Sequence, residues 1–201
     1  MIRLLLLLLS PILTACSPWS LPKTTNAIVT GGTKGIGHAI VAELAQTLDV
    51  HVLTCSRSQE DLDKCLEEWK AMGLSEKING VVADVSTAEG RDTLISEAKK
   101  CFCENADDAL SLDILVNNVG TNIRKPTLEY SSEELDFILT TNFKSMYELS
   151  KLCHPYMKRD SQDEKGMASI VNIGSVAGVT CMKSGTPYAA TKAAMNQLSG
   201  T

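Results

Sequence analysis

The feature that most constrains this chain is a regular alternation of short apolar runs with longer segments of helical periodicity. Five apolar runs end at turn residues, at 26–30, 50–55, 78–85, 112–120 and 168–175. Continuous apolar runs indicate strands buried on both faces, and strands joined through helices must run parallel. The chain has 201 residues and is 44% hydrophobic, which is enough for one such core. The sequence therefore predicts an α/β fold, a doubly wound parallel sheet.

Cap patterns predict where the intervening helices begin. A serine followed three residues later by an acidic residue satisfies free N–H groups at a helix start. Three such pairs precede periodic segments: Ser58 with Asp61, Ser86 with Glu89, and Ser131 with Glu134. Gly73 is expected to end the helix that Ser58 begins. The helical region after Ser131 is expected to reach about Lys158, and the last helix should begin near Thr186.

A glycine-rich loop, "TGGTKGIG" at residues 30–37, connects the first strand to the first helix. Gly31, Gly35 and Gly37 let the backbone turn sharply and let a pyrophosphate approach the free N–H groups of the helix. Glycines in a loop are more often plain turn residues, so the motif alone is weak. Its place after the first buried strand favours dinucleotide binding, with Thr33, Lys34 and Ile36 of the same loop in the cofactor site.

The end of the second strand indicates which dinucleotide is bound. NAD sites usually have an acidic residue here, which binds the ribose hydroxyls. This chain instead has Cys55, Ser56 and Arg57, and Lys34 adds a second cation from the glycine loop. A single arginine is by default an ordinary surface residue. Two cations without a competing carboxylate predict a pocket for the 2′-phosphate of NADP(H).

Tyr188 and Lys192 are four residues apart in a predicted helix and therefore lie on one face. An ammonium beside a phenol stabilises the phenolate, which makes Tyr188 a usable acid for a carbonyl oxygen. The bare pattern is common on solvated helix faces. However, Ser175 ends the fifth strand, and Asn117 and Asn118 end the fourth, on the carboxyl edge where ligands bind in such sheets. These polar strand ends favour an active site.

Charge and cysteine content exclude other classes of function. The net charge is −5, the pI is about 5.2, and no Lys/Arg-rich run is present. Nucleic-acid binding needs a basic face, so we expect no nucleic-acid partner. The seven cysteines show no zinc-like spacing, so no metal site is expected. Their number and scatter predict reduced, buried thiols rather than disulfides.

At this point the chain resembles the short-chain dehydrogenase/reductase family, and more narrowly its tropinone reductase-like branch. The matching segments occur in the family's order: "TGGTKGIG", "ADV" at 83–85, "NNVG" at 117–120, "TTNF" around Asn142, "IGSVAG" around Ser175, and "YAATK" at 188–192. "WSL" at 19–21 and "VNNVGTNIRKPTLEY" at 116–130 are similar to that branch in particular. The resemblance runs from about Trp19 to the last residue.

The resemblance implies a role for each matching residue. Tyr188 would donate the proton, and Lys192 would assist it and hold the nicotinamide ribose. Ser175 would bind the substrate oxygen, and Asn142 would support a water-linked proton relay. The remaining matches would contact the cofactor, with Asp84 and Val85 beside the adenine and Asn118 and Gly120 in the cleft. The resemblance implies an NADPH-dependent reductase of a small-molecule carbonyl substrate, forming a homodimer or homotetramer at full length.

The N-terminal segment differs from the family pattern. Residues 1–18 contain one basic residue, an apolar run too short to span a bilayer, and then small residues, as in a secretory signal peptide. "LTAC" at 13–16 also fits a lipoprotein cleavage site, and a misassigned start codon is the third interpretation. The resemblance implies a cytoplasmic protein, whereas a signal peptide implies the secretory pathway. The NADP-binding domain is therefore expected over residues 19–201.

The C-terminal end also differs, because family members continue with two more β-α units. The resemblance implies that the last two strands of the family's sheet, roughly 50–60 residues, are missing here. We expect an open edge on the fifth strand and poor cover over Ala193, Met195 and Leu198 of the last helix, so that this chain alone is a poor enzyme. A 3-oxoacyl-[acyl-carrier-protein] reductase is the alternative within the enzyme class. A non-catalytic cofactor-binding protein is the alternative outside it.

Overall fold

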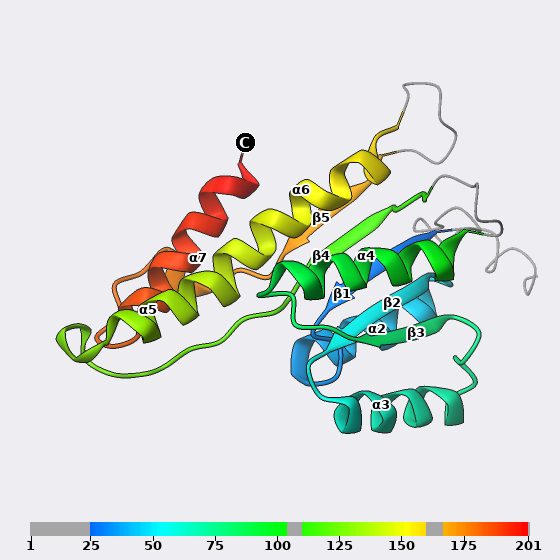
Figure 1. The fold of residues 1–201 in the computed structure, drawn as a ribbon, viewed down its shortest axis with the longest axis horizontal. Coiled ribbons are helices and arrows are strands. Elements are labelled where there is room, and N and C mark those ends of the chain that lie inside the picture. Colours follow the sequence, from blue (N-terminus) through cyan, green and yellow to red (C-terminus); the bar gives the residue numbers. More distant parts are fainter. Residues whose placement is uncertain (1–24, 104–109, 160–166, 201) are drawn as a thin grey trace, which may run out of the picture.

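A computed structural model describes residues 25–103, 110–159 and 167–200, and within them five parallel strands make one sheet. The strands lie in the order β3-β2-β1-β4-β5 (Figure 1). Their bounds are β1 Asn26–Thr30, β2 His51–Ser56, β3 Ile78–Val82, β4 Ile114–Asn117 and β5 Ser169–Asn172. The order reverses between β1 and β4, which places a topological switch point at the carboxyl ends of these two strands. The predicted doubly wound parallel sheet is confirmed.

Helices cover both faces of this sheet. They are α2 Gly35–Thr47, α3 Gln59–Ala71, α4 Ala88–Phe102, α5 Ser132–Leu139, α6 Ser145–Met157 and α7 Thr186–Ser199, with short turns η1 Thr127–Glu129, η2 Thr140–Lys144 and η3 Val176–Gly178. Figure 1 shows α5 and α7 side by side beyond the end of the sheet, where they pack against each other. Within the described ranges, no helix is both long and apolar enough to cross a bilayer.

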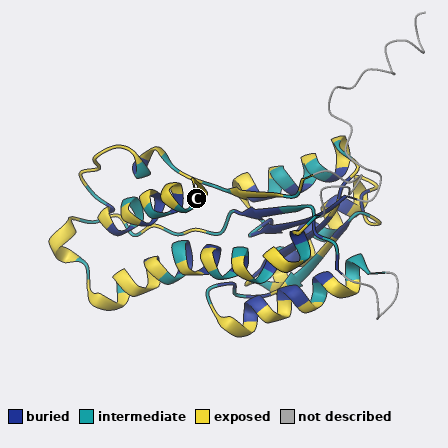
Figure 2. Cartoon of the chain, turned by 90° about the horizontal axis from the view of Figure 1, so that it is seen from above, coloured by how far each residue is buried: buried dark blue, intermediate teal, exposed yellow. Residues whose placement is uncertain are grey.

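The apolar runs fold as strands because both sides of each strand have helices to pack against. In β1, Ile28 belongs to a core cluster that includes Leu94 of α4 and Leu149 of α6. Its neighbour Val29 belongs to the opposite cluster, with Trp69 of α3. Successive strand residues point to opposite faces, so a run without polar residues buries both. Figure 2 shows the strands in the buried colour between helices with exposed outer faces.

Two of the three predicted helix starts are confirmed, and one is wrong by a residue. Ser58 accepts a hydrogen bond from the Asp61 N–H, and Ser131 forms a complete capping box with Glu134. The start of α4 is capped by Thr87, not Ser86. The Ser86 N–H instead bonds the Asp84 carboxylate, which holds Ser86 in the preceding turn.

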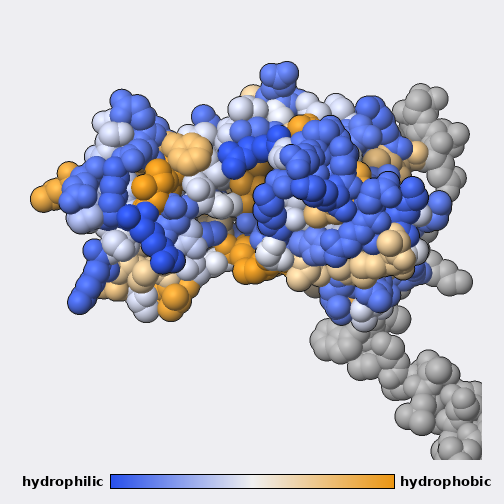
Figure 3. Space-filling model, turned by 90° about the horizontal axis from the view of Figure 1, so that it is seen from below, coloured by the Kyte–Doolittle hydropathy of each residue, from blue (hydrophilic) through white to orange (hydrophobic). Residues whose placement is uncertain are grey.

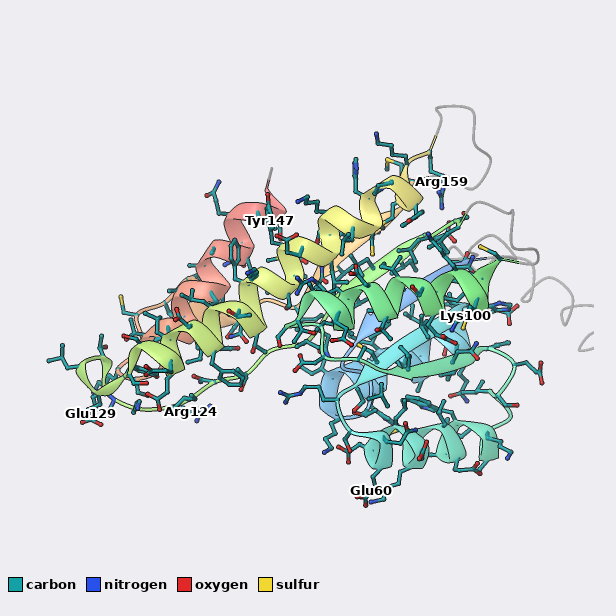
Figure 4. All side chains as sticks on the ribbon, in the orientation of Figure 1. Glu60, Lys100, Arg124, Glu129, Tyr147 and Arg159 are labelled. Carbon is teal, nitrogen blue, oxygen red and sulfur yellow. The ribbon has the colours of Figure 1, made fainter. Side chains whose placement is uncertain are left out.

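The helical region after Ser131 reaches Met157, close to the predicted end, but it is not one regular helix. α5 and α6 are joined by the π-helical turn η2, which contains Asn142. At the other end of α6, Arg159 donates to Asp113 at 2.6 Å and so ties this end to the start of β4 (Figure 4). β3, β4 and β5 end at positions 82, 117 and 172, earlier than predicted. The polar residues at the ends of the three predicted strands, Asp84, Asn118 and Ser175, lie in the loops that follow.

The expected exposure at β5 and α7 is correct in part. β5 is the edge strand of the described sheet, and Ile170 and Val171 are each about two-fifths exposed. Ala193 is exposed and Leu198 is half-buried, as expected. Met195 is only 1% exposed, so its predicted lack of cover is wrong. Met195 is covered because α7 packs closely on η3, η2 and α5.

The described cysteines agree with the prediction of free thiols, but only three of the six are buried as predicted. All six described cysteines are free, and Cys55, Cys65 and Cys153 are buried. Burial raises the pKa of Cys55 to about 11 and that of Cys153 to about 12. Cys181 is exposed, contrary to the prediction, because it lies in the loop before α7. The expected leader at residues 1–18 and Cys16 within it lie outside the described residues.

Candidate active site

The glycine-rich loop turns from β1 into α2 at the switch point of the sheet. Gly31 and Gly35 have positive φ angles of 68° and 56°. A Cβ atom on Gly37 would collide with the Gly31 carbonyl oxygen and the Asn118 side chain, so the backbone packs here as only glycine allows. In the part of the chain described, no side chain caps the first turn of α2. Its free N–H groups fit a pyrophosphate.

Asn118 holds this loop against the end of β4. Its Nδ2 donates to the carbonyl oxygens of Thr30 at 2.9 Å and Gly31 at 3.1 Å. In return, the Thr30 hydroxyl accepts the N–H groups of Asn118 and Val119 at 3.0 and 3.1 Å. The asparagine predicted to line the cleft therefore also fixes the shape of the glycine loop.

A cavity of about 470 Å³ opens beside this loop, and we call it the glycine-loop cavity. Ten of the predicted cofactor residues line it: Gly31, Thr33, Lys34, Ile36, Ser56, Arg57, Asp84, Val85, Asn118 and Gly120. Gly35 and Gly37 do not line it, and they shape the backbone behind it. The predicted cofactor residues thus come together from the loop and from the ends of β2, β3 and β4.

The structure corrects the prediction that no carboxylate competes for the two cations. The Nζ atom of Lys34 lies 2.6 Å from Oδ2 of Asp61, which also lines the cavity. The prediction from the sequence considered only the residues directly after β2, whereas Asp61 lies in the first turn of α3. Arg57 is exposed at the same cavity and forms no ion pair among the described residues. Arg57 is therefore the available cation.

Arg91 supports the far wall of the glycine-loop cavity. It is only 6% exposed, and its Nη1 donates to the carbonyl oxygens of Val85 and Ser86 at 2.9 and 3.1 Å. These bonds fix the loop after β3 that carries Asp84. Sequence reasoning missed this arginine, although a charged residue on the buried face of a predicted helix is a usable signal.

A second cavity, of about 460 Å³, contains the predicted catalytic residues, and we call it the tyrosine cavity. Ser175, Tyr188 and Lys192 all line it. α7 brings Tyr188 and Lys192 onto one face, with the Lys192 Nζ atom 5.7 Å from the centre of the Tyr188 ring. The predicted pairing of an ammonium with a phenol is therefore present.

Lys192 is held rigidly for a lysine. Its side chain is buried, and Nζ donates to the Ile173 carbonyl oxygen at 2.6 Å. Burial lowers the pKa of Lys192, because desolvation disfavours the ammonium form. The end of β5 thus fixes the amine next to the tyrosine.

Ser175 begins the turn η3 directly after β5. Its Oγ accepts the Ala177 N–H at 3.2 Å, which fixes the side chain at the wall of the tyrosine cavity. Because the oxygen acts as an acceptor in this bond, the hydroxyl hydrogen is left to donate to another group. Ser175 is half-exposed, so such a group could come from the cavity.

Asn142 is fully buried in the π-helical turn and has a complete set of protein partners. Oδ1 accepts the Thr121 N–H at 2.7 Å, and Nδ2 donates to the Thr121 carbonyl at 2.9 Å and to Thr191 Oγ1 at 3.2 Å. A methyl group on Gly120 would lie 3.6 Å from Asn142 Oδ1 and 3.7 Å from Lys192 Nζ. Asn142 and Lys192 therefore border the same small space, and Asn142 also ties the loop after β4 to α7.

The two cavities adjoin each other. Four residues line both of them: Ile36, Asn118, Gly120 and Thr121. Seen from below, apolar side chains are visible at the waist between a larger and a smaller lobe (Figure 3). Within the described residues, no group of three metal-ligating side chains lies together. The arrangement offers one continuous site, with anion-binding groups at one end and a tyrosine, a serine and a lysine at the other.

Sequence reasoning missed several residues of this site. Asp61 lines the glycine-loop cavity and Arg91 supports the loop that carries Asp84. Asn122 and Arg124, on the loop after β4, line the tyrosine cavity together with Val176 and Met182. Figure 4 labels Arg124 on this loop. No local pattern marks the residues on these loops, because only the folded chain brings them to the cavity.

Comparison with known proteins identifies the family. The model of the short chain dehydrogenase family matches residues 25–201, a span that includes every described residue. The chain belongs to the short-chain dehydrogenase family.

Relatives place it in the tropinone reductase-like branch of that family. A tropinone reductase homolog from Arabidopsis thaliana is 50% identical over 180 residues, covering 90% of this chain and 62% of the relative. A tropinone reductase homolog from Datura stramonium is 44% identical with the same coverage. The chain thus spans less than two thirds of the length of these relatives.

Solved structures of family members have the same fold. A short-chain dehydrogenase/reductase from Brucella melitensis, titled a glucose/ribitol dehydrogenase, matches with a TM-score of 0.74 at 25% identity. The match covers 90% of this chain and 69% of that one. A variant of actinorhodin polyketide ketoreductase, solved with NADPH, matches with a TM-score of 0.74 at 26% identity, covering 90% and 64%. The described part of this chain therefore has the fold of the family.

Proposed function

We propose that this protein is an NADPH-dependent oxidoreductase that reduces a ketone or other carbonyl to an alcohol. The observation that supports this most strongly is that the glycine-loop cavity and the tyrosine cavity share four lining residues. A dinucleotide with its pyrophosphate at the start of α2 would extend from Arg57 at one end to Tyr188 at the other. Its nicotinamide, when bound, supplies the hydride to the carbonyl carbon.

The protein's own part in the reaction is to orient the carbonyl and to supply a proton. The Tyr188 hydroxyl gives its proton to the carbonyl oxygen as that oxygen gains negative charge. Ser175 donates its free hydroxyl hydrogen to the same oxygen, which fixes the carbonyl in place. Lys192 stabilises the phenolate that remains after transfer, and Asn142 holds the neighbouring backbone through Thr121.

Three observations support NADPH rather than NADH. Arg57 is exposed at the glycine-loop cavity without an ion-pair partner in the described part of the chain. Ser56 lies beside it, and the Ser58 N–H already bonds the Ser56 hydroxyl at 3.1 Å, which orders the turn. No acidic residue directly follows β2. A 2′-phosphate would therefore find a guanidinium, its preferred partner.

The relatives indicate the class of substrate. The relatives from Arabidopsis thaliana and Datura stramonium, at 50% and 44% identity, are named tropinone reductase homologs, so we propose a small cyclic ketone. The same names favour this substrate class over the acyl-carrier-protein thioesters that the alternative reductase would use. A homodimer or homotetramer stays a prediction from the family, to be checked by light scattering.

The Tyr188→Phe substitution tests the proposal, with Tyr147→Phe as a matched control. Tyr147 lies on α6, is 44% exposed and is absent from both cavities (Figure 4). With a cyclic ketone and NADPH, Tyr188→Phe should lower kcat by roughly 10²- to 10⁴-fold, because only the transferable proton is lost. NADPH binding should change little, and Tyr147→Phe should behave like the parent. Near-parental turnover in Tyr188→Phe would contradict the role of this tyrosine. If the chain extended by the family's two further β-α units also lacks turnover, a non-catalytic cofactor-binding protein is favoured.

A further inference from the structure

An ion pair at the mouth of the glycine-loop cavity is not explained by the proposed function. Lys34 comes from the glycine loop, and Asp61 comes from the first turn of α3, 27 residues later. Their charged atoms are 2.6 Å apart, and both residues line the cavity with Arg57. A carboxylate therefore lies among the cations proposed to bind a phosphate.

Asp61 is the better-fixed partner of this pair. Its backbone N–H donates to the Ser58 cap at 3.2 Å, so the start of α3 sets its position. Its side chain is 29% exposed, whereas that of Lys34 is 75% exposed. The hydrogen bond from Lys34 lowers the pKa of Asp61, which keeps the carboxylate charged at neutral pH. The lysine is thus drawn toward Asp61 rather than the reverse.

The charges around the cavity then largely cancel. Lys34 and Arg57 are positive, while Asp61 and Asp84 are negative, and these four line the same space. A phosphate monoester carries between one and two negative charges near pH 7. It would compete with Asp61 for Lys34 and would be repelled by Asp61 directly. The adenosine of NAD(H), which has a hydroxyl group at this position, meets neither cost.

We infer that Asp61 is a specificity-determining residue that weakens the preference of this site for NADP(H) over NAD(H). The inference rests on the proposed function, since it concerns the same dinucleotide site. In it, Arg57 supplies the attraction for the 2′-phosphate, and Asp61 limits that attraction by holding Lys34. The preference of the site for NADPH over NADH is then smaller than it would be if Lys34 and Arg57 were both free to bind the 2′-phosphate.

The test compares Asp61→Asn with Asp63→Asn. Asp63 lies on the same helix with the same charge, but it bonds Gln59 at 2.7 Å and does not line the cavity. Dissociation constants are measured by calorimetry for NADPH and NADH, and for adenosine 2′,5′-bisphosphate and 5′-AMP, at low and high salt. Asp61→Asn should raise the preference for the 2′-phosphate roughly tenfold at low salt, and high salt should reduce this gain. Asp63→Asn and the charge-conserving Asp61→Glu should both stay close to the parent.

Three results would overturn the inference. An unchanged preference in Asp61→Asn would show that the pair does not reach the phosphate. A lower preference would mean that Asp61 positions Lys34 for the phosphate instead of withholding it. An equal gain in Asp63→Asn would show only an effect of net charge. A parent that binds neither dinucleotide would overturn the proposed function as well, whereas an NADPH-selective parent with an unresponsive Asp61→Asn would overturn the inference alone.

Discussion

The contact between η3 and α7 allows a sharp test of how the catalytic helix is held. Gly178 ends η3, and a Cβ atom added there would lie 2.8 Å from the Lys192 carbonyl carbon and 2.9 Å from its oxygen. Ordinary carbon contacts are about 3.5 Å or longer. Gly178→Ala must therefore move the backbone of α7 by roughly 0.6 Å at the residue that supports Tyr188. Overpacking of this kind costs about 1–3 kcal/mol of stability.

The catalytic effect should be larger than the structural one. A misplacement of about 1 Å can cost roughly a hundredfold in rate, so this shift should lower kcat about tenfold. NADPH affinity should fall much less, because Arg57 and the glycine loop lie at the other end of the site. The assay measures kcat with a cyclic ketone, NADPH affinity by calorimetry, and thermal unfolding for each variant.

Gly174→Ala is the matched control in the same segment. A Cβ atom on Gly174 would lie 3.5 Å from Asn196 Oδ1, an ordinary contact, and it meets no backbone of α7. This variant should keep the parent's kcat and melting temperature within error. Equal losses in Gly174→Ala, or a Gly178→Ala variant with parental kcat, would refute the argument that the contact with α7 positions the catalytic pair.

Two further predictions concern the charged residues of the site. Arg57→Asp should weaken NADPH binding roughly ten- to a hundredfold and leave NADH binding nearly unchanged, because a charge-assisted bond to the 2′-phosphate is lost; calorimetric titration of both cofactors would show a parallel loss if this were wrong. Lys192→Met should lower kcat by roughly a hundredfold or more in the same ketone assay. Burial lowers the pKa of Lys192 in the folded chain from its ordinary value of about 10.5. Between the lowered pKa and about pH 10.5 the unfolded chain binds more protons than the folded one, so the stability of the parent should increase there as pH rises. Urea unfolding of Lys192→Met between about pH 7 and about pH 10 should lack that gain, and an identical pH dependence would contradict it.

Much of the fold followed from local sequence patterns. Strand positions were predictable because residues such as Ile28 and Val29 must both be buried, which leaves no polar alternation. The capping box of Ser131 was predictable because all its atoms lie within one turn. The start of α4 was mispredicted because Ser86 and Thr87 are both good caps. The choice between them depends on the Asp84 carboxylate and carbonyl, which hold the preceding turn.

The site residues that lie at strand ends were predictable from the sequence. Ser175 and Asn118 follow buried strands, so the carboxyl edge of the sheet had to bring them together. The pairing of Lys34 with Asp61 was not predictable, because it joins the glycine loop to the first turn of α3, which only the folded sheet makes neighbours. The burial of Arg91 could have been read from its place on the buried face of a helix, but its partners could not, because backbone carbonyls have no sequence signature.

The π-helical turn between α5 and α6 makes this part of the chain sensitive to length rather than to composition. A π turn accommodates one more residue than an α turn between successive hydrogen bonds. Each residue advances an α-helix by about 100°. Adding a residue to Thr140–Lys144 would rotate α5 by about that angle relative to α6, because this turn already holds the one extra residue that a π turn accommodates. The buried Ile138 would then face away from its packing partners, and α5 would hold the active site less well.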